Sequence, residues 1–217
     1  MFWRILPHAT ACVASNKLFV LDLRRDRYFR VPQSAHAEML TWLNVRHGAP
    51  APDAIIDLLG KARVLQRSDP VPTNALRDRV RIPDTLVQAR EAPARGSAVA
   101  VARQVTAAWL RLRCSPLHLI LSRRRMRTPL PVLGQLDATL VEAAAFERSR
   151  PLVPIARNCL LDSLALDSWL ARRGYGAQLV FGIMPEPFAA HCWLQTPQAL
   201  LNDSYDHVSG FTPILAL

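Results

Sequence analysis

Three residues in the last third of the chain have the types and the order of a thiol-dependent catalytic site. Cys159 stands at the start of a segment with helical character, His191 lies within a predicted strand, and Asp203 ends the next predicted strand. A thiol at a helix N-terminus feels the positive end of the helix dipole, which favours the thiolate, and an adjacent imidazole stabilises it as an ion pair. A carboxylate on the neighbouring strand orients that imidazole. The pattern predicts attack of a cysteine on a carbonyl carbon, with backbone N–H groups at the helix start, including that of Cys159, as donors to the oxyanion.

Two of these roles have simpler interpretations, and the third has rivals. A lone cysteine in an apolar helix is usually a core residue, and a lone histidine in a strand is no stronger a signal. Asp206 and His207 lie close enough to Asp203 in the sequence to take its place beside His191. The succession of cysteine on a helix, then histidine and aspartate on adjacent strands, is what favours the catalytic interpretation.

The neighbours of His191 are interpreted from the alternation of a strand. Cys192 faces away from His191, so it is expected to pack behind the site, and a zinc site of Cys159, His191 and Cys192 is not expected. Trp193 shares the face of His191, where it either shields the imidazole or belongs to the core. The sequence predicts no metal ion and no cofactor.

An α+β arrangement is expected to position these residues. Apolar residues at spacings of three and four predict helices, and the last of these ends at Gly174. The helices predicted after residue 97 span 98–113, 117–126, 132–148 and 159–173. The strands predicted in the same part span 178–183, 190–195 and 199–203.

The first 70 residues have the pattern of a small separate domain. Turn signals separate three segments rich in β-branched and aromatic residues, which predicts a three-stranded antiparallel meander over 9–14, 17–23 and 27–31. Helices are predicted over 34–44 and 53–62, with Ser34 and Asp53 as N-caps. Residues 71–97 are polar and rich in proline, and we interpret them as a linker between domains 1–70 and 98–217.

Composition excludes several classes of protein. The 217 residues are 50% hydrophobic and 20% charged, enough for a sizeable core and against wholesale disorder. The net charge of +10 is unevenly placed. Residues 1–70 hold ten basic and six acidic side chains, 71–130 hold twelve and three, and 131–217 hold five and eight. The excess positive charge therefore lies mainly in residues 71–130. There the cluster from Arg123 to Arg127 is either a solvated helix face or a docking surface.

Cysteine usage and the amino terminus indicate a cytoplasmic protein. Four cysteines, with no CxxC pair, are too few for a disulfide scaffold. Arg4, Pro7 and His8 interrupt the first apolar run before it could form a signal-peptide core. No uncharged apolar run approaches the roughly 18 residues that a membrane span needs.

The residues of the last third resemble a known family. Residues 158–166, 179–183 and 187–194, together with 202–203 and 210–215, are similar to the transglutaminase-like cysteine protease of lasso peptide maturation. Cysteine stands at position 192, where that family commonly has alanine. The first 70 residues are similar to the small winged-helix-like module that recognises leader peptides in such pathways. Together the two parts resemble the fused form of the lasso peptide B protein.

This resemblance implies an endopeptidase that removes the leader from a ribosomally made precursor peptide. Cys159 would be the nucleophile, His191 the general base and acid, and Asp203 the residue that orients His191. The family prefers threonine at the second-to-last leader position, so a small pocket for it is expected. The partners implied are the precursor peptide and an ATP-dependent macrolactam synthetase resembling asparagine synthetase, which joins the freed amino group to an acidic side chain.

The resemblance also implies where the leader binds. An extended peptide can add a strand to an open sheet edge, and the recognition module uses its third strand together with its last helix. The residues implicated on the third strand are Arg27, Tyr28, Phe29, Arg30 and Val31. Those implicated in the 53–67 segment are Lys61, Arg63 and Arg67, whose charge suits acidic leader residues. Tyr28 and Phe29 face opposite sides, so one of them is expected in the core.

Two other functions remain open at this stage. A transglutaminase or amidase would use the same triad, because formation of an acyl-enzyme is common to both and only the acceptor, water or amine, differs. A basic winged-helix protein that binds nucleic acid would fit the charge. Against it, the helix over 53–62 carries Asp53, Asp57 and apolar residues, which do not suit phosphates or base edges. We therefore expect a peptide or protein partner rather than nucleic acid.

Overall fold

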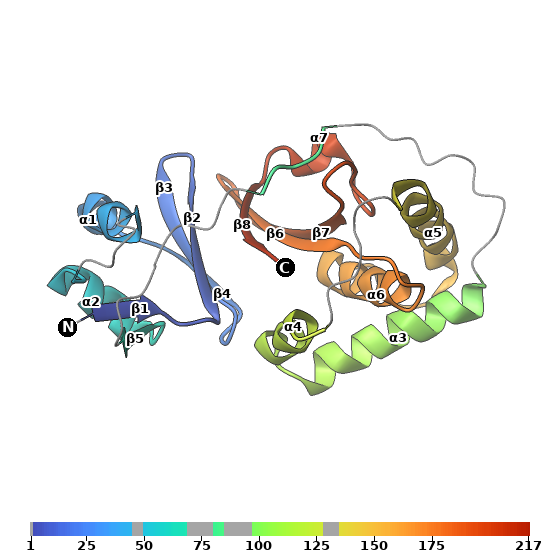
Figure 1. Cartoon of the computed structure of the whole chain (residues 1–217), viewed down its shortest axis with the longest axis horizontal. Helices are drawn as coiled ribbons and strands as arrows, with labels where there is room; N and C mark the ends of the chain where they lie inside the picture. The colour runs from blue at the N-terminus through green and yellow to red at the C-terminus, as the bar shows by residue number, and fades with distance from the viewer. Residues whose placement is uncertain (1, 45–49, 69–79, 85–96, 128–134) are drawn as a thin grey trace. The chain divides into compact units, whose positions relative to one another are not determined.

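The computed structural model describes residues 2–44, 50–68, 80–84, 97–127 and 135–217. The chain forms two compact units (Figure 1). The first comprises residues 1–79 with 185–187, and the second comprises residues 80–184 and 188–217. Both helices and strands occur in each unit, as the α+β prediction requires.

The first unit contains the predicted meander. Strands β2 (Ala9–Ala14), β3 (Lys17–Asp22) and β4 (Arg27–Arg30) form an antiparallel sheet in the order β2-β3-β4. Ser15 and Asn16 connect β2 to β3 with φ angles of 45° and 57°, the left-handed pair that a tight hairpin turn requires. β4 lies at an edge of this sheet among the described residues.

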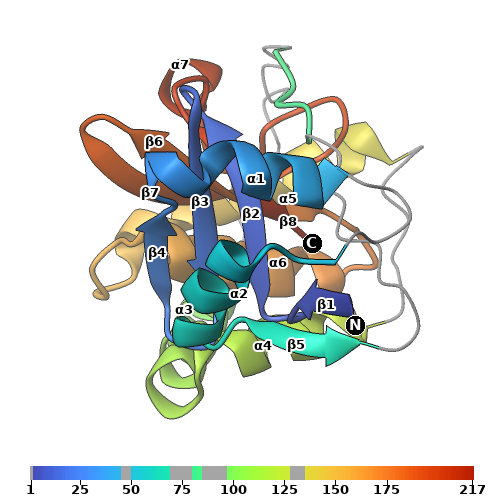
Figure 2. The same ribbon diagram turned by 90° about the vertical axis from the view of Figure 1, so that its left-hand side faces the viewer.

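Two helices pack on the meander, as Figure 2 shows from the side of this unit. They are α1 (Gln33–Asn44) and α2 (Asp53–Lys61). Their buried side chains and those of the sheet form one core. Its largest members include Leu18, Met39, Trp42, Leu43, Ile55 and Leu59.

The predicted N-caps Ser34 and Asp53 are wrong, because each lies inside its helix. Prolines hold the preceding positions: the carbonyl of Pro32 accepts the N–H of Ala35 at 3.0 Å, and that of Pro52 accepts the N–H of Ile55 at 2.9 Å. No side chain caps α2. The fixed φ of proline suits the start of a helix, and α2 begins without a side-chain cap.

One small sheet of the first unit was not predicted. Strands β1 (Phe2–Ile5) and β5 (Leu65–Ser68) pair antiparallel, with Trp3 opposite Arg67. Arg63, with a φ of 54°, turns the chain from α2 toward β5. Each strand has only four residues and its partner lies far away in the sequence, so neither carries a local strand signal.

The second unit places four helices against a sheet (Figure 1). The helices are α3 (Ala98–Cys114), α4 (Leu117–Arg125), α5 (Leu136–Ser149) and α6 (Cys159–Ala171). They confirm the predicted helices, although the predicted start of the third at residue 132 lies outside the described residues. Gly174 has a φ of 82°, as expected of the residue that ends α6.

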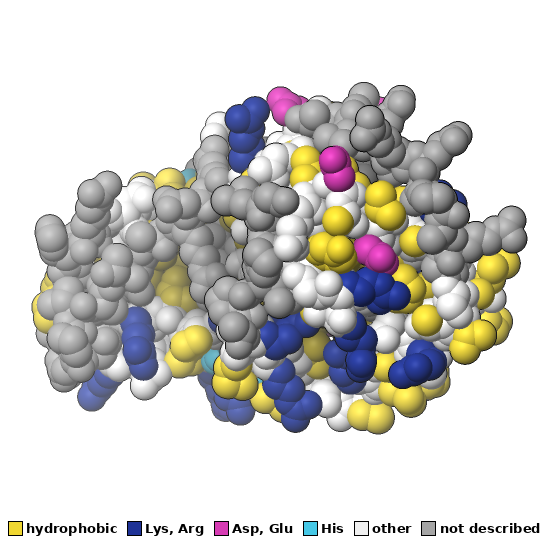
Figure 3. All heavy atoms as spheres, turned by 45° about the vertical axis from the view of Figure 1, so that its right-hand side comes forward, with side chains coloured by type: hydrophobic (Ala, Val, Ile, Leu, Met, Phe, Trp, Pro, Cys, Tyr) yellow, Lys and Arg dark blue, Asp and Glu magenta, His cyan; other side chains and the backbone are white. Residues whose placement is uncertain are grey.

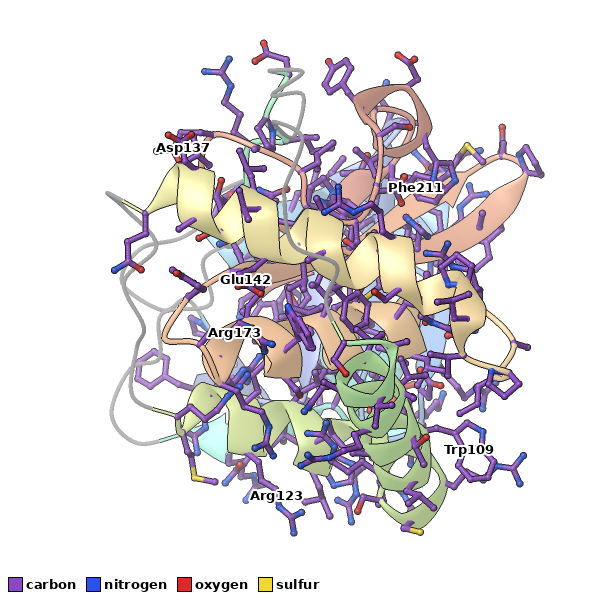
Figure 4. All side chains as sticks on the ribbon, turned by 90° about the vertical axis from the view of Figure 1, so that its right-hand side faces the viewer. Trp109, Arg123, Asp137, Glu142, Arg173 and Phe211 are labelled. Atoms are coloured by element: carbon purple, nitrogen blue, oxygen red, sulfur yellow. The ribbon has the colours of Figure 1, made fainter. Side chains whose placement is uncertain are left out.

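Helix α6 is the centre of this unit. It packs on strand β7 (Phe188–Gln195) on one side and against α3 and α5 on others. Most of its residues are buried, as expected of a helix that is apolar on nearly all sides. Glu142 of α5 binds both Trp169 of α6 and Arg173, which follows α6, with Arg173 Nε 2.7 Å from the carboxylate (Figure 4).

The sheet corrects one predicted strand. Its order is β7-β6-β8, with β6 (Gln178–Pro185) in the centre and β8 (Thr212–Ala216) as the third strand. The predicted strand 199–203 does not form: only Leu200 makes a bridge, with Gln195. The side-chain oxygen of Asn202 accepts the N–H of Leu194 at 2.8 Å. This side-chain hydrogen bond takes the place of a backbone hydrogen bond between two strands, and the chain leaves the sheet here.

Part of the segment predicted as a linker packs on the second unit. Val80 and Ile82 lie against the core formed by Val180, Trp193, Val208 and Phe211. The backbone carbonyl of Arg81 accepts a hydrogen bond from Gln195 Nε2 at 2.9 Å. Residues 69–79 and 85–96 of this region lie outside the described residues.

In the described part of the chain, no helix combines the length and the apolar character needed to cross a lipid bilayer.

Candidate active site

Cys159 is the first residue of α6, and Asn158 fixes its position. Asn158 is extended, and its Oδ1 accepts the N–H groups of Leu160 at 3.1 Å and Leu161 at 3.3 Å. Three N–H groups of the first turn have no partner within the helix, and this cap satisfies two of them. The cap does not engage the N–H of Cys159, whose side chain is half-buried.

The structure brings Cys159, His191 and Asp203 together. His191 projects from β7, and its Nε2 lies 2.5 Å from Asp203 Oδ2. Its ring also hydrogen-bonds the thiol of Cys159, for which the remaining nitrogen, Nδ1, is available. The side chains of His191 and Asp203 are each only 13% exposed, so water screens this pair little.

The electrostatics of the three groups favour an ion pair. The hydrogen bond from His191 is the largest cause that lowers the pKa of Cys159, helped by the backbone N–H groups of Cys192 and Leu160 and opposed by burial. Burial lowers the pKa of His191, but the hydrogen bonds with Asp203 and Cys159 outweigh it and raise that pKa to about 9. A thiolate beside an imidazolium is the reactive form of a cysteine nucleophile.

His207 is a second histidine on the same carboxylate. Its Nδ1 lies 2.8 Å from Asp203 Oδ1, and its ring centroid lies 4.6 Å from that of His191. Burial raises the pKa of Asp203, but hydrogen bonds from His191, His207 and the N–H of Ser204 lower it below its ordinary value. Among the described contacts, His191 meets Asp203 and not Asp206. His207 was considered as a substitute for Asp203, whereas the structure makes it a partner of Asp203.

Aromatic residues enclose the imidazole of His191. The ring of Trp193 is stacked on it at 5.9 Å, and Phe211, labelled in Figure 4, lies at 5.3 Å. Trp193 is fully buried and donates its Nε1–H to Gln195 Oε1 at 2.8 Å. It therefore fills both roles that the sequence left open, as a shield of the imidazole and as a core residue.

Gly182 of β6 makes the close approach of Trp193 possible. A Cβ atom at this position would lie 2.8 Å from two ring atoms of Trp193 and 3.0 Å from the Cβ of Phe211. Any larger residue would displace the ring that stacks on His191.

Cys192 packs behind the site, as predicted. Its side chain is buried, and burial raises the pKa of its thiol far above the ordinary value. The zinc ligand set of Cys159, His191 and Cys192 is not formed. Among the described residues, ligand atoms of His191, Asp203 and His207 lie within 4.8 Å of one another, but both histidines are hydrogen-bonded to the carboxylate of Asp203.

Two polar networks that the sequence did not reveal hold the site. Asn202 Nδ2 donates to Ser163 Oγ at 2.9 Å, and Ser163 Oγ donates to the carbonyl of Cys192 at 3.2 Å. These bonds join the turn that carries Asp203 to α6 and to β7. The one signal for them is the position of Asn202, immediately before Asp203.

The second network lies before the nucleophile. Arg150 is 1% exposed, and its Nε donates to Asp162 Oδ1 of α6 at 2.7 Å. Its other nitrogens donate to the carbonyls of Val153 and Ile155. An unpaired buried charge would be costly, so this cation ties the segment that enters α6 to the helix itself.

The residues predicted to bind a leader lie in the first unit. Arg27 and Arg30 are exposed on β4, and Phe29 packs against the core, as expected for one of the aromatic pair. Val31 was expected to contact the leader, but its side chain is buried in the core and its N–H donates to the carbonyl of Leu18 at 2.8 Å. A side-chain contact between Val31 and a leader is therefore not supported, because this side chain belongs to the core of the first unit.

The remaining candidates, Lys61, Arg63 and Arg67, are all exposed. Lys61 pairs with Asp57 at 2.9 Å, and the guanidinium of Arg67 lies 5.6 Å from the ring of Trp3.

A protein-family model matches residues 98–216, more than half of the chain. The matching family is described as the transglutaminase-like superfamily. A search of curated proteins found no match. A search of solved structures found none either.

Proposed function

The chain belongs to the transglutaminase-like superfamily, and from that premise we propose that it is the leader peptidase of a lasso peptide pathway. This proposed enzyme binds the leader of a precursor peptide through its first unit and cleaves the leader from the core peptide with Cys159, His191 and Asp203. One observation carries the enzymatic part: a thiol with a lowered pKa meets an imidazole whose pKa is raised to about 9. Perturbed pKa values of this kind are typical of catalytic sites.

The mechanism follows from the atoms in place. The thiolate of Cys159 attacks the carbonyl carbon of the scissile peptide bond, and the N–H of Cys159, which Asn158 does not use, donates to the developing oxyanion. His191 gives its proton to the leaving amine, which becomes the new amino terminus of the core peptide. A water molecule, deprotonated by His191, then attacks the thioester and releases the leader carboxylate. Throughout, Asp203 holds the imidazole.

The first unit fits the role of a small winged-helix-like leader-recognition domain. The backbone N–H of Val31 points toward β3, where it donates to the carbonyl of Leu18. Along an edge strand, the backbone N–H and C=O groups of every second residue point toward the neighbouring strand, and those of the residues between point away from the sheet. The N–H and C=O of Arg30 thus face the side on which an added strand would pair. A leader with acidic residues would meet the exposed guanidiniums of Arg27 and Arg30 on this strand.

The charge of α2 argues against nucleic acid as the partner. This helix, which would be the recognition helix of a DNA-binding winged-helix domain, exposes Asp53 and Asp57. Carboxylates repel phosphates, so we propose a precursor peptide as the ligand. An ATP-dependent macrolactam synthetase resembling asparagine synthetase is the proposed partner that consumes the new amino group.

Mass spectrometry of a precursor peptide incubated with the protein, with and without the synthetase, tests this proposal. We expect two fragments whose masses sum to the precursor plus one water. Cys159→Ala should abolish the cleavage and leave leader binding unchanged, while Cys114→Ala, which removes an exposed cysteine outside the site, should cleave normally. Cleavage by Cys159→Ala at the wild-type rate would refute the assignment.

An acyl transferase of the transglutaminase or amidase type is the second candidate, favoured by the same thiol–imidazole pair, which forms an acyl-enzyme in either case. The acceptor distinguishes the two functions. A reaction in ¹⁸O-labelled water that contains a primary amine decides between them. Uptake of ¹⁸O into the leader carboxylate identifies a peptidase, and a mass increase equal to amine minus ammonia on a glutamine-containing peptide identifies a transglutaminase.

A further inference from the structure

A second polar site lies in the second unit, along the C-terminal half of α6. It is a cavity of about 190 Å³ lined by residues of α3, α4 and α6. Its charged lining consists of Arg111, Arg123, Arg124, Arg127 and Asp167. Asp167 follows Cys159 by eight residues, which is about 12 Å along a helix, so this cavity is separate from the candidate active site.

Four arginines and one aspartate line this cavity. Asp167, whose side chain is 8% exposed, accepts Arg124 Nη2 at 2.9 Å on Oδ1 and Arg127 on Oδ2. Arg124 also donates to the carbonyl of Ala177 at 2.7 Å. The single negative charge is therefore shared by Arg124 of α4 and by Arg127, which follows α4. Both join this part of the chain to α6 and are structural.

The other two arginines have no carboxylate partner among the described residues. Arg111 donates to Ser168 Oγ at 3.0 Å and to the carbonyl of Ala107 at 3.2 Å, both neutral acceptors. Arg123 is exposed on α4 (Figure 4). Figure 3 shows several arginine side chains gathered on the lower part of this unit, which contains no lysine.

The surplus positive charge is costly to the protein in the absence of an anion. Burial lowers the pKa of Arg111, and repulsion from Arg127 and Arg172 lowers it further. A bound anion would relieve this repulsion. Guanidinium groups present fixed pairs of N–H donors that match phosphate oxygens, and the hydroxyls of Ser115 and Ser168 line the same cavity.

We propose that this cavity is a binding site for a phosphate-type anion, with Arg111 and Arg123 as its principal ligands. A phosphate dianion balances the surplus charge more fully than a single carboxylate would. The cavity is smaller than the roughly 300–1,000 Å³ of pockets that enclose a whole small-molecule ligand. It therefore fits inorganic phosphate or the phosphate group of a larger molecule whose remainder stays outside.

Isothermal titration of the full chain with inorganic phosphate tests the site, with chloride used to hold the ionic strength constant. We expect saturable binding with one phosphate per chain. Arg123→Gln and Arg111→Gln should each weaken it about tenfold, the cost of losing a charged hydrogen bond. Arg103→Gln is the matched control, because Arg103 is also an exposed arginine of α3 but lies outside this cavity, and it should bind phosphate as the wild type does.

Adenosine monophosphate, titrated in parallel, separates the two sources of phosphate. Equal affinity identifies the free anion as the ligand, and tighter binding identifies a phosphate ester. Arg123 has no described partner, so its substitution should leave the unfolding temperature in chloride unchanged and keep the test independent of folding. Absence of saturable phosphate binding, or equal weakening by Arg103→Gln and Arg123→Gln, would overturn the proposal. Cleavage of the precursor plays no part in these measurements, so their failure would leave the proposed function untouched.

Discussion

His207 Nδ1 lies 2.8 Å from Asp203 Oδ1, on the carboxylate oxygen that His191 does not use. One aspartate thus connects two histidines, one 13% and the other 55% exposed. Oδ2 of Asp203 bonds His191, and Oδ1 bonds both His207 and the N–H of Ser204. Because both oxygens have partners, the orientation of the carboxylate toward His191 is restricted. His207 is therefore a positioning residue for the proposed chemistry.

Replacing His207 should reduce turnover more than affinity. His207→Ala removes one hydrogen bond, worth about 1 kcal/mol, from the carboxylate that orients His191, so we expect kcat to fall roughly fivefold to tenfold with KM nearly unchanged. Steady-state kinetics on a precursor peptide measures both constants. Asp206→Ala changes the preceding residue of the short helix α7 (Tyr205–Val208) and should keep full activity. A larger loss in that variant would transfer the role to Asp206.

The pH dependence of activity should have two limbs. Activity rises as Cys159 loses its proton, which occurs below the ordinary cysteine value because that pKa is lowered, and it falls as His191 loses its proton near pH 9. The hydrogen bond from Asp203 is a main cause that raises the pKa of His191. Asp203→Asn should therefore move the alkaline limb to lower pH as well as lower the rate. A profile of kcat/KM from pH 5 to 10 measures both limbs, and an alkaline limb that stays in place in this variant would contradict the coupling.

Gly182→Ala should harm both stability and activity. The added Cβ would lie 2.8 Å from Trp193, and overpacking of this kind costs about 1–3 kcal/mol and displaces the ring stacked on His191. Thermal unfolding and the rate of iodoacetamide modification of Cys159 report the two effects. Gly210→Ala is the control within the same unit, because its Cβ would meet only Met184 Sδ, at an ordinary 3.8 Å. Equal unfolding temperatures for the two variants would show that the close approach is unimportant.

Charge reversal on β4 should weaken binding of an acidic leader. Arg30→Glu places a negative charge where the added strand would pair, and we expect at least tenfold weaker binding of a fluorescent leader peptide, measured by anisotropy. Arg24→Glu makes the same change in the turn before β4, and its effect should be small. If both variants bind the leader as tightly as the wild type, β4 is not the docking edge.

Several features decided by neighbouring residues were predicted from the sequence, although the N-caps Ser34 and Asp53 were not among them. Ser15 and Asn16 form the hairpin turn of the meander, and the helix over 159–171 begins at Cys159 because Asn158 caps it. Such signals act within one or two turns of the chain. The strands β1, β5 and β8 were not predicted, since each is short and is stabilised by a partner strand far away in the sequence.

The sequence by itself determined the chemical groups of the site: a thiol at a helix start, an imidazole in a strand and a carboxylate after it. Only the tertiary structure decided which carboxylate meets His191, that His207 shares it, and that Val31 belongs to the core. It also decided that arginines of α3 and α4 line one cavity together with Asp167 of α6. The physical reason is the same in each case, because these contacts join side chains whose positions depend on how separate helices, strands and turns pack, and no local pattern encodes that packing.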